Sequence, residues 1–135
     1  MAKELTQLKK TVSSLLKTLS PRNRDIISRR FGLTNGRRET LEAIGTDYKI
    51  TRERVRQIAE FTLNQLRKVA QSDATVAQYV TSVRSILQKE GGVMREGDLF
   101  EAFSGKASYD VNNAGLVFLL ALSREMVKVD ENDRY

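Results

Sequence analysis

The 135-residue chain contains no cysteine and no histidine. Without cysteine there is no disulfide framework and no thiolate metal site. Without histidine, the commonest metal ligand and the commonest general base are both missing. The chain also has no glycine-rich phosphate loop and no cluster of carboxylates. We therefore expect a protein that is not an enzyme and that holds no metal or cofactor.

Long apolar runs are absent as well. No segment approaches the length of a membrane span, and the N-terminus has no signal-peptide pattern. Hydrophobic residues make up 40% of the chain and charged residues 30%, which is typical of a globular protein. The length suits one ordinary domain or two small ones. We expect a folded cytoplasmic protein that has no membrane partner.

The net charge of +6 is divided unevenly along the chain. Residues 1–72 hold 16 Lys and Arg against 7 Asp and Glu, a net charge of +9, whereas residues 73–135 hold 7 against 10, a net charge of −3. A basic half is what binding to nucleic acid requires, although basic residues also serve solvation alone. The joint Gln71–Ala74 is polar, and we place the boundary between two domains, 1–72 and 73–135, there.

The first half is predicted to be helical throughout. Leucine and valine side chains form one stripe over residues 4–19, and Ser20 with Pro21 begins a second helix that ends at Gly32. Thr40 caps a short third helix, and residues 45–49 are expected to form a turn. Thr51 then caps a longer helix that runs to about residue 70. A short helix, a turn and a longer helix are the parts of a helix-turn-helix.

The longer helix is predicted to be amphipathic. Its inward positions at helical spacing are Val55, Ile58, Thr62, Leu66 and Val69. Its outward N-terminal positions are Arg52, Glu53, Arg56 and Gln57. Arg can donate twice to guanine, Gln pairs with adenine, and Glu accepts from the cytosine amino group. Alone, such a face also fits a solvated helix with ion pairs at i and i+4.

Four separated motifs resemble region 4 of the bacterial sigma-70 family of sigma factors. They are Leu19–Ile27 (LSPRNRDII), Arg30–Leu33 (RFGL), Thr40–Gly45 (TLEAIG) and Thr51–Ile58 (TRERVRQI). The resemblance covers roughly residues 5–70, and the motifs occur in the family's order and spacing.

The resemblance implies particular roles for the outward residues. Arg52, Glu53 and Gln57 match positions that read bases of the promoter −35 element in the major groove, and Arg56 matches a residue that contacts mainly the DNA backbone. Thr40 and Leu41 match positions that touch the backbone at the edge of the site. A further set would belong to the surface that cradles the flap of the RNA polymerase β subunit: Leu16, Ile27 and Phe31.

The chain also departs from the family pattern. Ala59 and Phe61 stand where many members have an acidic and a basic residue, and we expect Phe61 to pack against the second domain. Nothing resembles regions 2 and 3, which bind the −10 element and open the duplex. The chain alone is therefore not expected to melt a promoter. It is either a stand-alone region 4 regulator or a fragment of a longer protein.

The second half is predicted to be a small winged-helix-like domain of helices with some strand, similar to the HARE-HTH class. We expect helices over 75–90, 96–103 and 110–123, the last of them apolar on every side, and short strands at Val93–Met94 and Met126–Val129. Residues 130–133 read as a turn. The sequence ends at Tyr135, about where a wing would turn back, which suggests a truncated chain or a wing completed by a partner.

The acidic balance disfavours DNA contact by this second domain, because phosphates repel acidic side chains. Contact with a protein, self-association and a purely stabilising role stay open. For the whole chain the sequence predicts a mainly α, DNA-binding transcription factor of the bacterial nucleoid. Its expected partners are double-stranded promoter DNA and RNA polymerase. The alternative is a protein-interaction module that binds the β flap or a regulator, with DNA contact secondary.

Overall fold

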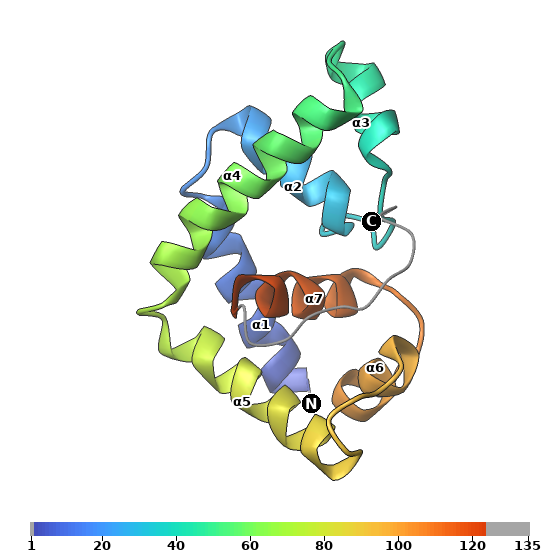
Figure 1. Ribbon diagram of the computed structural model, residues 1–135. Coiled ribbons are helices and arrows are strands. Elements are labelled where there is room, and N and C mark those ends of the chain that lie inside the picture. Colours follow the sequence, from blue (N-terminus) through green and yellow to red (C-terminus); the bar gives the residue numbers. More distant parts are fainter. Residues whose placement is uncertain (1, 124–135) are drawn as a thin grey trace.

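Helices account for all regular structure in the described part of the chain. The computed structural model describes residues 2–123. Its helices are α1 (Ala2–Leu16), α2 (Pro21–Phe31), α3 (Leu41–Tyr48), α4 (Arg52–Ala70), α5 (Ala74–Lys89), α6 (Glu96–Ser104) and α7 (Val111–Ser123) (Figure 1). No strand occurs within residues 2–123, and the predicted mainly α fold with a helix-turn-helix is confirmed.

The predicted helix starts are confirmed by their capping bonds. A hydroxyl at each N-cap accepts a backbone N–H of the first turn, which otherwise has no partner within the helix. These bonds run from Asn23 N to Ser20 Oγ (3.3 Å), from Ala43 N to Thr40 Oγ1 (3.1 Å) and from Arg54 N to Thr51 Oγ1 (3.1 Å). Helix α2 ends as predicted at Gly32, whose φ of 71° is left-handed.

Two predicted helix ends were wrong. Helix α1 ends at Leu16 and not near residue 19. Helix α3 passes through Gly45, where a turn was expected, and ends at Tyr48, before Lys49, whose φ is 58°. Gly45 instead allows a close approach, because a Cβ built there would lie 2.7 Å from the carbonyl oxygen of Ile50. This glycine brings the turn between α3 and α4 against α3.

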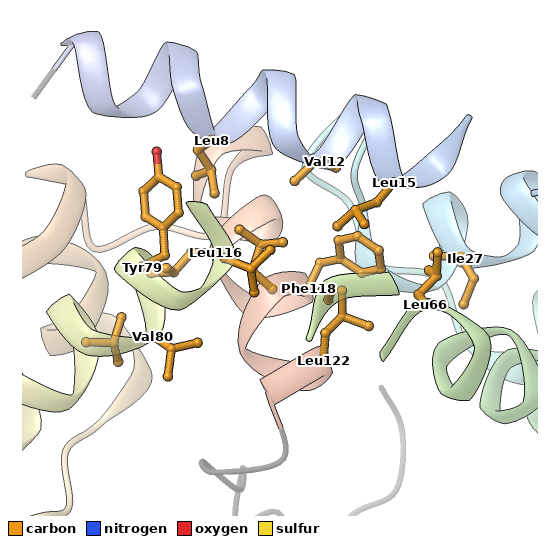
Figure 2. Close-up of a cluster of buried hydrophobic side chains, with 14 of the residues drawn as sticks. Leu8, Val12, Leu15, Ile27, Leu66, Tyr79, Val80, Leu116, Phe118 and Leu122 are labelled. Atoms are coloured by element: carbon orange, nitrogen blue, oxygen red, sulfur yellow. The ribbon is translucent and has the colours of Figure 1, made fainter. Parts of the chain in front are cut away.

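Helix α7 lies at the centre of the larger hydrophobic core. It packs against α1, α2, α4, α5 and α6 (Figures 1 and 2). Its buried apolar side chains are Ala114, Leu116, Phe118, Leu119 and Leu122. The prediction of a helix buried on several sides is therefore confirmed. Within residues 2–123, no helix combines the length and hydropathy needed to cross a bilayer.

Both halves of the sequence contribute to this larger core. Leu8, Leu15 and Leu66 come from the basic half, whereas Val83 and Phe100 come from the acidic half. The boundary at residue 72 coincides with the short connection between α4 and α5, where Asp73 caps α5. The division into two domains stays a prediction, and the two parts share one core.

Two side chains of α4 were predicted wrongly. Val69 is 47% exposed, because the inward stripe continues with a spacing of four residues from Leu66 to Ala70, which is buried. Phe61 is 60% exposed and does not pack against the second half as expected. The outer face of α4 therefore carries exposed apolar area.

The expected wing is not seen in the described residues. Val93 and Met94 form no strand, and Val93 is 83% exposed. A strand needs a partner for its backbone hydrogen bonds, and residues 2–123 supply none at this point. The second expected strand, Met126–Val129, and the turn at 130–133 lie outside the described residues. The winged-helix likeness thus stays a prediction.

The close approach at Gly45 leads to a stability prediction. Gly45→Ala should lower the free energy of unfolding by about 1–3 kcal/mol, because the new methyl group meets backbone that cannot rotate away. Urea denaturation followed by circular dichroism measures this change.

Gly97→Ala is the matched control. Gly97 lies in α6, and the nearest atom to a Cβ there is 3.6 Å away, an ordinary contact. This variant should be unchanged or gain up to about 1 kcal/mol, because Ala is the better helix former. A Gly45→Ala variant as stable as the wild type would refute the close approach.

Candidate nucleic-acid interface

A small second core fixes α4 to α3. It consists of buried apolar side chains from α2, α3 and α4: Ile26, Leu41, Ile44, Val55 and Ile58. Tyr48 and Ile50 pack against it from the end of α3 and from the turn. Because these side chains occupy the inner faces, the first two turns of α4 present their other face to solvent.

The sequence-predicted base readers lie on that exposed face. Arg52, Glu53 and Gln57 are exposed, and Arg56 is half-buried. The Arg52 side chain is exposed and forms no ion pair with any described residue, although its charge acts on Glu53. Gln57 accepts a long bond of 3.5 Å from Arg54. Because these contacts are few and exposed, Arg52 and Gln57 can reach a base edge without breaking a buried interaction.

Arg56 is held by two glutamates of its own helix. Its Nη2 lies 2.6 Å from Glu53 Oε1, and its Nη1 lies 2.8 Å from Glu60 Oε2. Exposed pairs of this kind are screened by water and contribute little to stability. A phosphate can therefore compete for Arg56 at small cost.

These contacts also act on Glu53. The Arg56 guanidinium, which donates to both Glu53 oxygens, holds the pKa of that carboxyl below its usual range, and the charge of Arg52 acts in the same direction. Glu53 is therefore an ionised, acceptor-only group at neutral pH.

The two residues predicted at the start of α3, Thr40 and Leu41, differ in the groups that they expose for DNA contact. Thr40 is exposed, and its hydroxyl accepts the Ala43 N–H. The Leu41 side chain is only 4% exposed and belongs to the small core. A DNA contact at Leu41 is thus limited to its backbone N–H, at the positive end of the α3 dipole.

Arg29 of α2 was missed by sequence reasoning. It forms ion pairs with Glu39 at 2.7 Å, with Asp47 of α3, and with Asp25 at 3.8 Å. Tyr48 donates to the same Asp25. The spacing of four residues between Asp25 and Arg29 was a visible signal, but the partners from the connection and from α3 were not. This cluster ties the helix-turn-helix to the helix before it.

Together these features define a class of protein. Two helices joined by a tight turn, with an exposed Arg, Glu and Gln face at the start of the second, form a helix-turn-helix of the DNA-binding kind.

Comparison with known proteins specifies the family. Residues 15–68 match the family described as Sigma-70, region 4. The RNA polymerase sigma factors SigA of Microcystis aeruginosa and of Synechocystis are each 48% identical over 60 residues, which is 44% of this chain and 14% of the relative. SigA of Clostridium acetobutylicum is 43% identical over 65 residues, 48% of this chain and 17% of the relative.

Residues 15–68 therefore match region 4 of the sigma-70 family, as the sequence motifs indicated. Region 4 is a DNA-binding domain and not an enzymatic one. The chain spans less than a fifth of the length of these relatives. Residues 69–135 lie outside the matched family segment.

The ion pair at the start of α4 leads to a titration prediction. In an NMR titration, the Glu53 carboxyl should protonate at a lower pH than an ordinary glutamate, because protonation breaks its bonds from Arg56. The contribution of this pair to stability is thus present at neutral pH and lost only as the pH falls through the lowered pKa.

Arg56→Gln is the comparison variant. Removing the guanidinium should raise the pKa of Glu53 towards its usual value while the helix content stays unchanged. Identical Glu53 titrations in the two proteins would show that the pair does not persist in solution.

Proposed function

We propose that the chain is a sequence-specific DNA-binding transcription factor that reads a promoter −35-like element in the major groove and associates with RNA polymerase. The observation that carries the proposal is the exposed set Arg52, Glu53 and Gln57 at the start of α4. The similarity of residues 15–68 to proteins named RNA polymerase sigma factors supports both parts of it. Its site of action is then the nucleoid in the bacterial cytoplasm.

Each side chain of the face has a separate task in this proposal. Arg52 donates to guanine, Gln57 pairs with adenine, and the ionised Glu53 accepts from the cytosine amino group. Arg56 leaves one or both glutamates and binds a phosphate. The charge of +9 over residues 1–72 supplies the long-range attraction to the duplex.

The start of α3 supplies backbone contacts at the edge of the site. The Thr40 hydroxyl already accepts one N–H of the first turn, so it serves mainly to order the helix terminus. The Leu41 N–H and its neighbours then point at a phosphate, which the helix dipole attracts. These contacts carry affinity but no sequence information.

The β flap has less access to this chain than the family resemblance implied. Ile27 is fully buried, and the ring of Phe31 packs edge-on against Phe118 of α7 at 5.4 Å between centroids. Leu16 also packs against the larger core. A flap docked on this face would have to displace α7. We therefore keep DNA reading as the primary function and place flap binding second.

The first functional prediction concerns base reading. In a fluorescence anisotropy titration, a duplex with a −35-like element should bind more tightly than a scrambled duplex. Arg52→Ala should lose about 1–3 kcal/mol of binding free energy on the −35-like duplex and much less on the scrambled one. Affinity for both duplexes should fall steeply with salt.

Lys89→Ala is the charge-matched control. Lys89 is exposed at the end of α5, at the opposite end of the molecule from the start of α4 (Figure 1). The Lys89→Ala variant loses one positive charge, as Arg52→Ala does, and should retain the wild-type preference for the −35-like duplex over the scrambled one. Equal binding of the wild type to the two duplexes would reject base reading.

The second functional prediction concerns the polymerase. Immobilised core RNA polymerase should retain the wild type and the Arg52→Ala variant equally, because Arg52 lies on the DNA-facing end of α4. Retention is measured without DNA at moderate salt. If the polymerase does not retain Arg52→Ala, Arg52 is a protein-contact residue. That result would favour the alternative, in which the chain is a protein-interaction module and DNA contact is secondary.

A further inference from the structure

We propose that Tyr109 and Glu96, in the half of the chain outside the family match, are positioning residues for DNA contact. They hold the connection between α2 and α3, residues 32–40, through Arg38. This inference rests on the proposed DNA-binding function, because the connection leads directly into Thr40 and the start of α3.

The connection is anchored on one side by its own half. The Glu39 N–H donates to the Arg29 carbonyl oxygen at 3.0 Å, and the Glu39 carboxylate pairs with the Arg29 guanidinium at 2.7 Å. Gly32 is packed so closely against the backbone of Arg37 that a Cβ there would lie 2.8 Å away. These contacts fix both ends of the connection relative to α2.

The other side of the connection is held by the second half. The Arg38 guanidinium carbon lies 3.8 Å from the centroid of the Tyr109 ring, a cation–π contact. Arg38 Nη1 also lies 3.3 Å from Glu96 Oε1, at the first residue of α6. The Tyr109 hydroxyl donates to the carbonyl oxygen of Phe31 at 2.7 Å, at the end of α2. Tyr109 thus contacts the last residue of α2 and also Arg38, near the end of the connection.

The backbones also meet in the middle of the connection. A Cβ on Gly36 would lie 3.0 Å from the Cα of Asp110, the residue before α7. The connection is therefore pressed against the segment that carries Tyr109. The Arg38 and Glu96 side chains are only 20% and 30% exposed, so water and salt screen this pair less than the pairs on α4.

Pre-organisation is the physical consequence. Helix α3 has only eight residues, so the order of its first turn depends on contacts with other parts of the chain. With Arg38 clamped two residues before the cap, the first turn of α3 is oriented before DNA arrives. If the clamp is released, only part of the molecules present that orientation, and the apparent dissociation constant rises as the competent fraction falls.

The main experiment compares Glu96→Gln with Asp98→Asn in the full chain. Each variant removes one negative charge from the first turn of α6, but only Glu96 contacts Arg38, whereas Asp98 pairs with Arg95 at 3.0 Å. Binding to the −35-like and scrambled duplexes is titrated, with the active fraction measured by stoichiometric titration. Amide hydrogen exchange is followed over residues 34–43 and over α4.

We expect Glu96→Gln to bind both duplexes about three- to tenfold more weakly than Asp98→Asn, with the ratio between the duplexes unchanged. In Glu96→Gln, amide hydrogen exchange should become faster at residues 34–43 and stay unchanged in α4. A purely stabilising role would instead raise exchange throughout the core and leave the affinity of the active fraction unchanged. Tighter binding by Glu96→Gln would also overturn the proposal, because Glu96 would then withhold Arg38 from DNA.

Tyr109 provides a second, independent pair of variants. Tyr109→Phe keeps the ring under Arg38 and loses only the bond to Phe31, so most of the affinity should remain. Tyr109→Leu loses both contacts and should match or exceed the loss in Glu96→Gln. Equal affinities for Tyr109→Leu and the wild type would overturn the role of Tyr109. If the wild type itself shows no preference for the −35-like duplex, both the proposed function and this inference fail.

Discussion

The burial of α7 is the constraint on which the rest of the structure depends. Five other helices pack against this one, and it joins the basic and acidic halves in a single core. Full burial of a Leu or Phe side chain contributes about 1.5–3 kcal/mol, whereas an exposed ion pair contributes about 0–1 kcal/mol. The apolar contacts of α7 therefore outweigh the many surface ion pairs in deciding how the halves are arranged.

This arrangement decides which helix faces are covered by other helices and which stay exposed to solvent. The faces of α1 and α2 that point at α7 are occupied, and the ring of Phe31, in the family segment, packs edge-on against Phe118. The outer face of the first turns of α4, which carries Arg52, Glu53 and Gln57, is exposed to solvent. The same packing thus leaves the proposed DNA-reading face of α4 exposed and covers the side chains that were expected to contact the flap. This is the physical reason for ranking DNA contact above flap contact.

The two cores have different tasks. The larger core holds the molecule together, and the smaller one sets the angle between α3 and α4. Charged clusters then tie the helix-turn-helix to its surroundings, through Arg29 on one side and Arg38 on the other. Since these arginines are each only 20% exposed, their ion pairs are more strongly constrained than those along α4.

Much of the local structure could be predicted from the sequence. The caps at Ser20, Thr40 and Thr51 were predictable because each hydroxyl bonds an N–H three residues later. The outward face of Arg52, Glu53 and Gln57 was predictable because helical periodicity places it opposite the apolar residues. Their roles on DNA came from the family motifs and stay a proposal.

Only the tertiary structure decided how the halves meet. Arg38 and Glu96 are 58 residues apart, and Tyr109 and Phe31 are 78 apart, so no local pattern pairs them. The burial of Ala70 in place of Val69, and the exposure of Phe61, were also missed by the sequence pattern. The sequence by itself therefore determined the helices and the exposed polar face of α4, through local hydrogen bonds and periodicity. The tertiary structure decided which faces stay open, because that depends on contacts between distant segments.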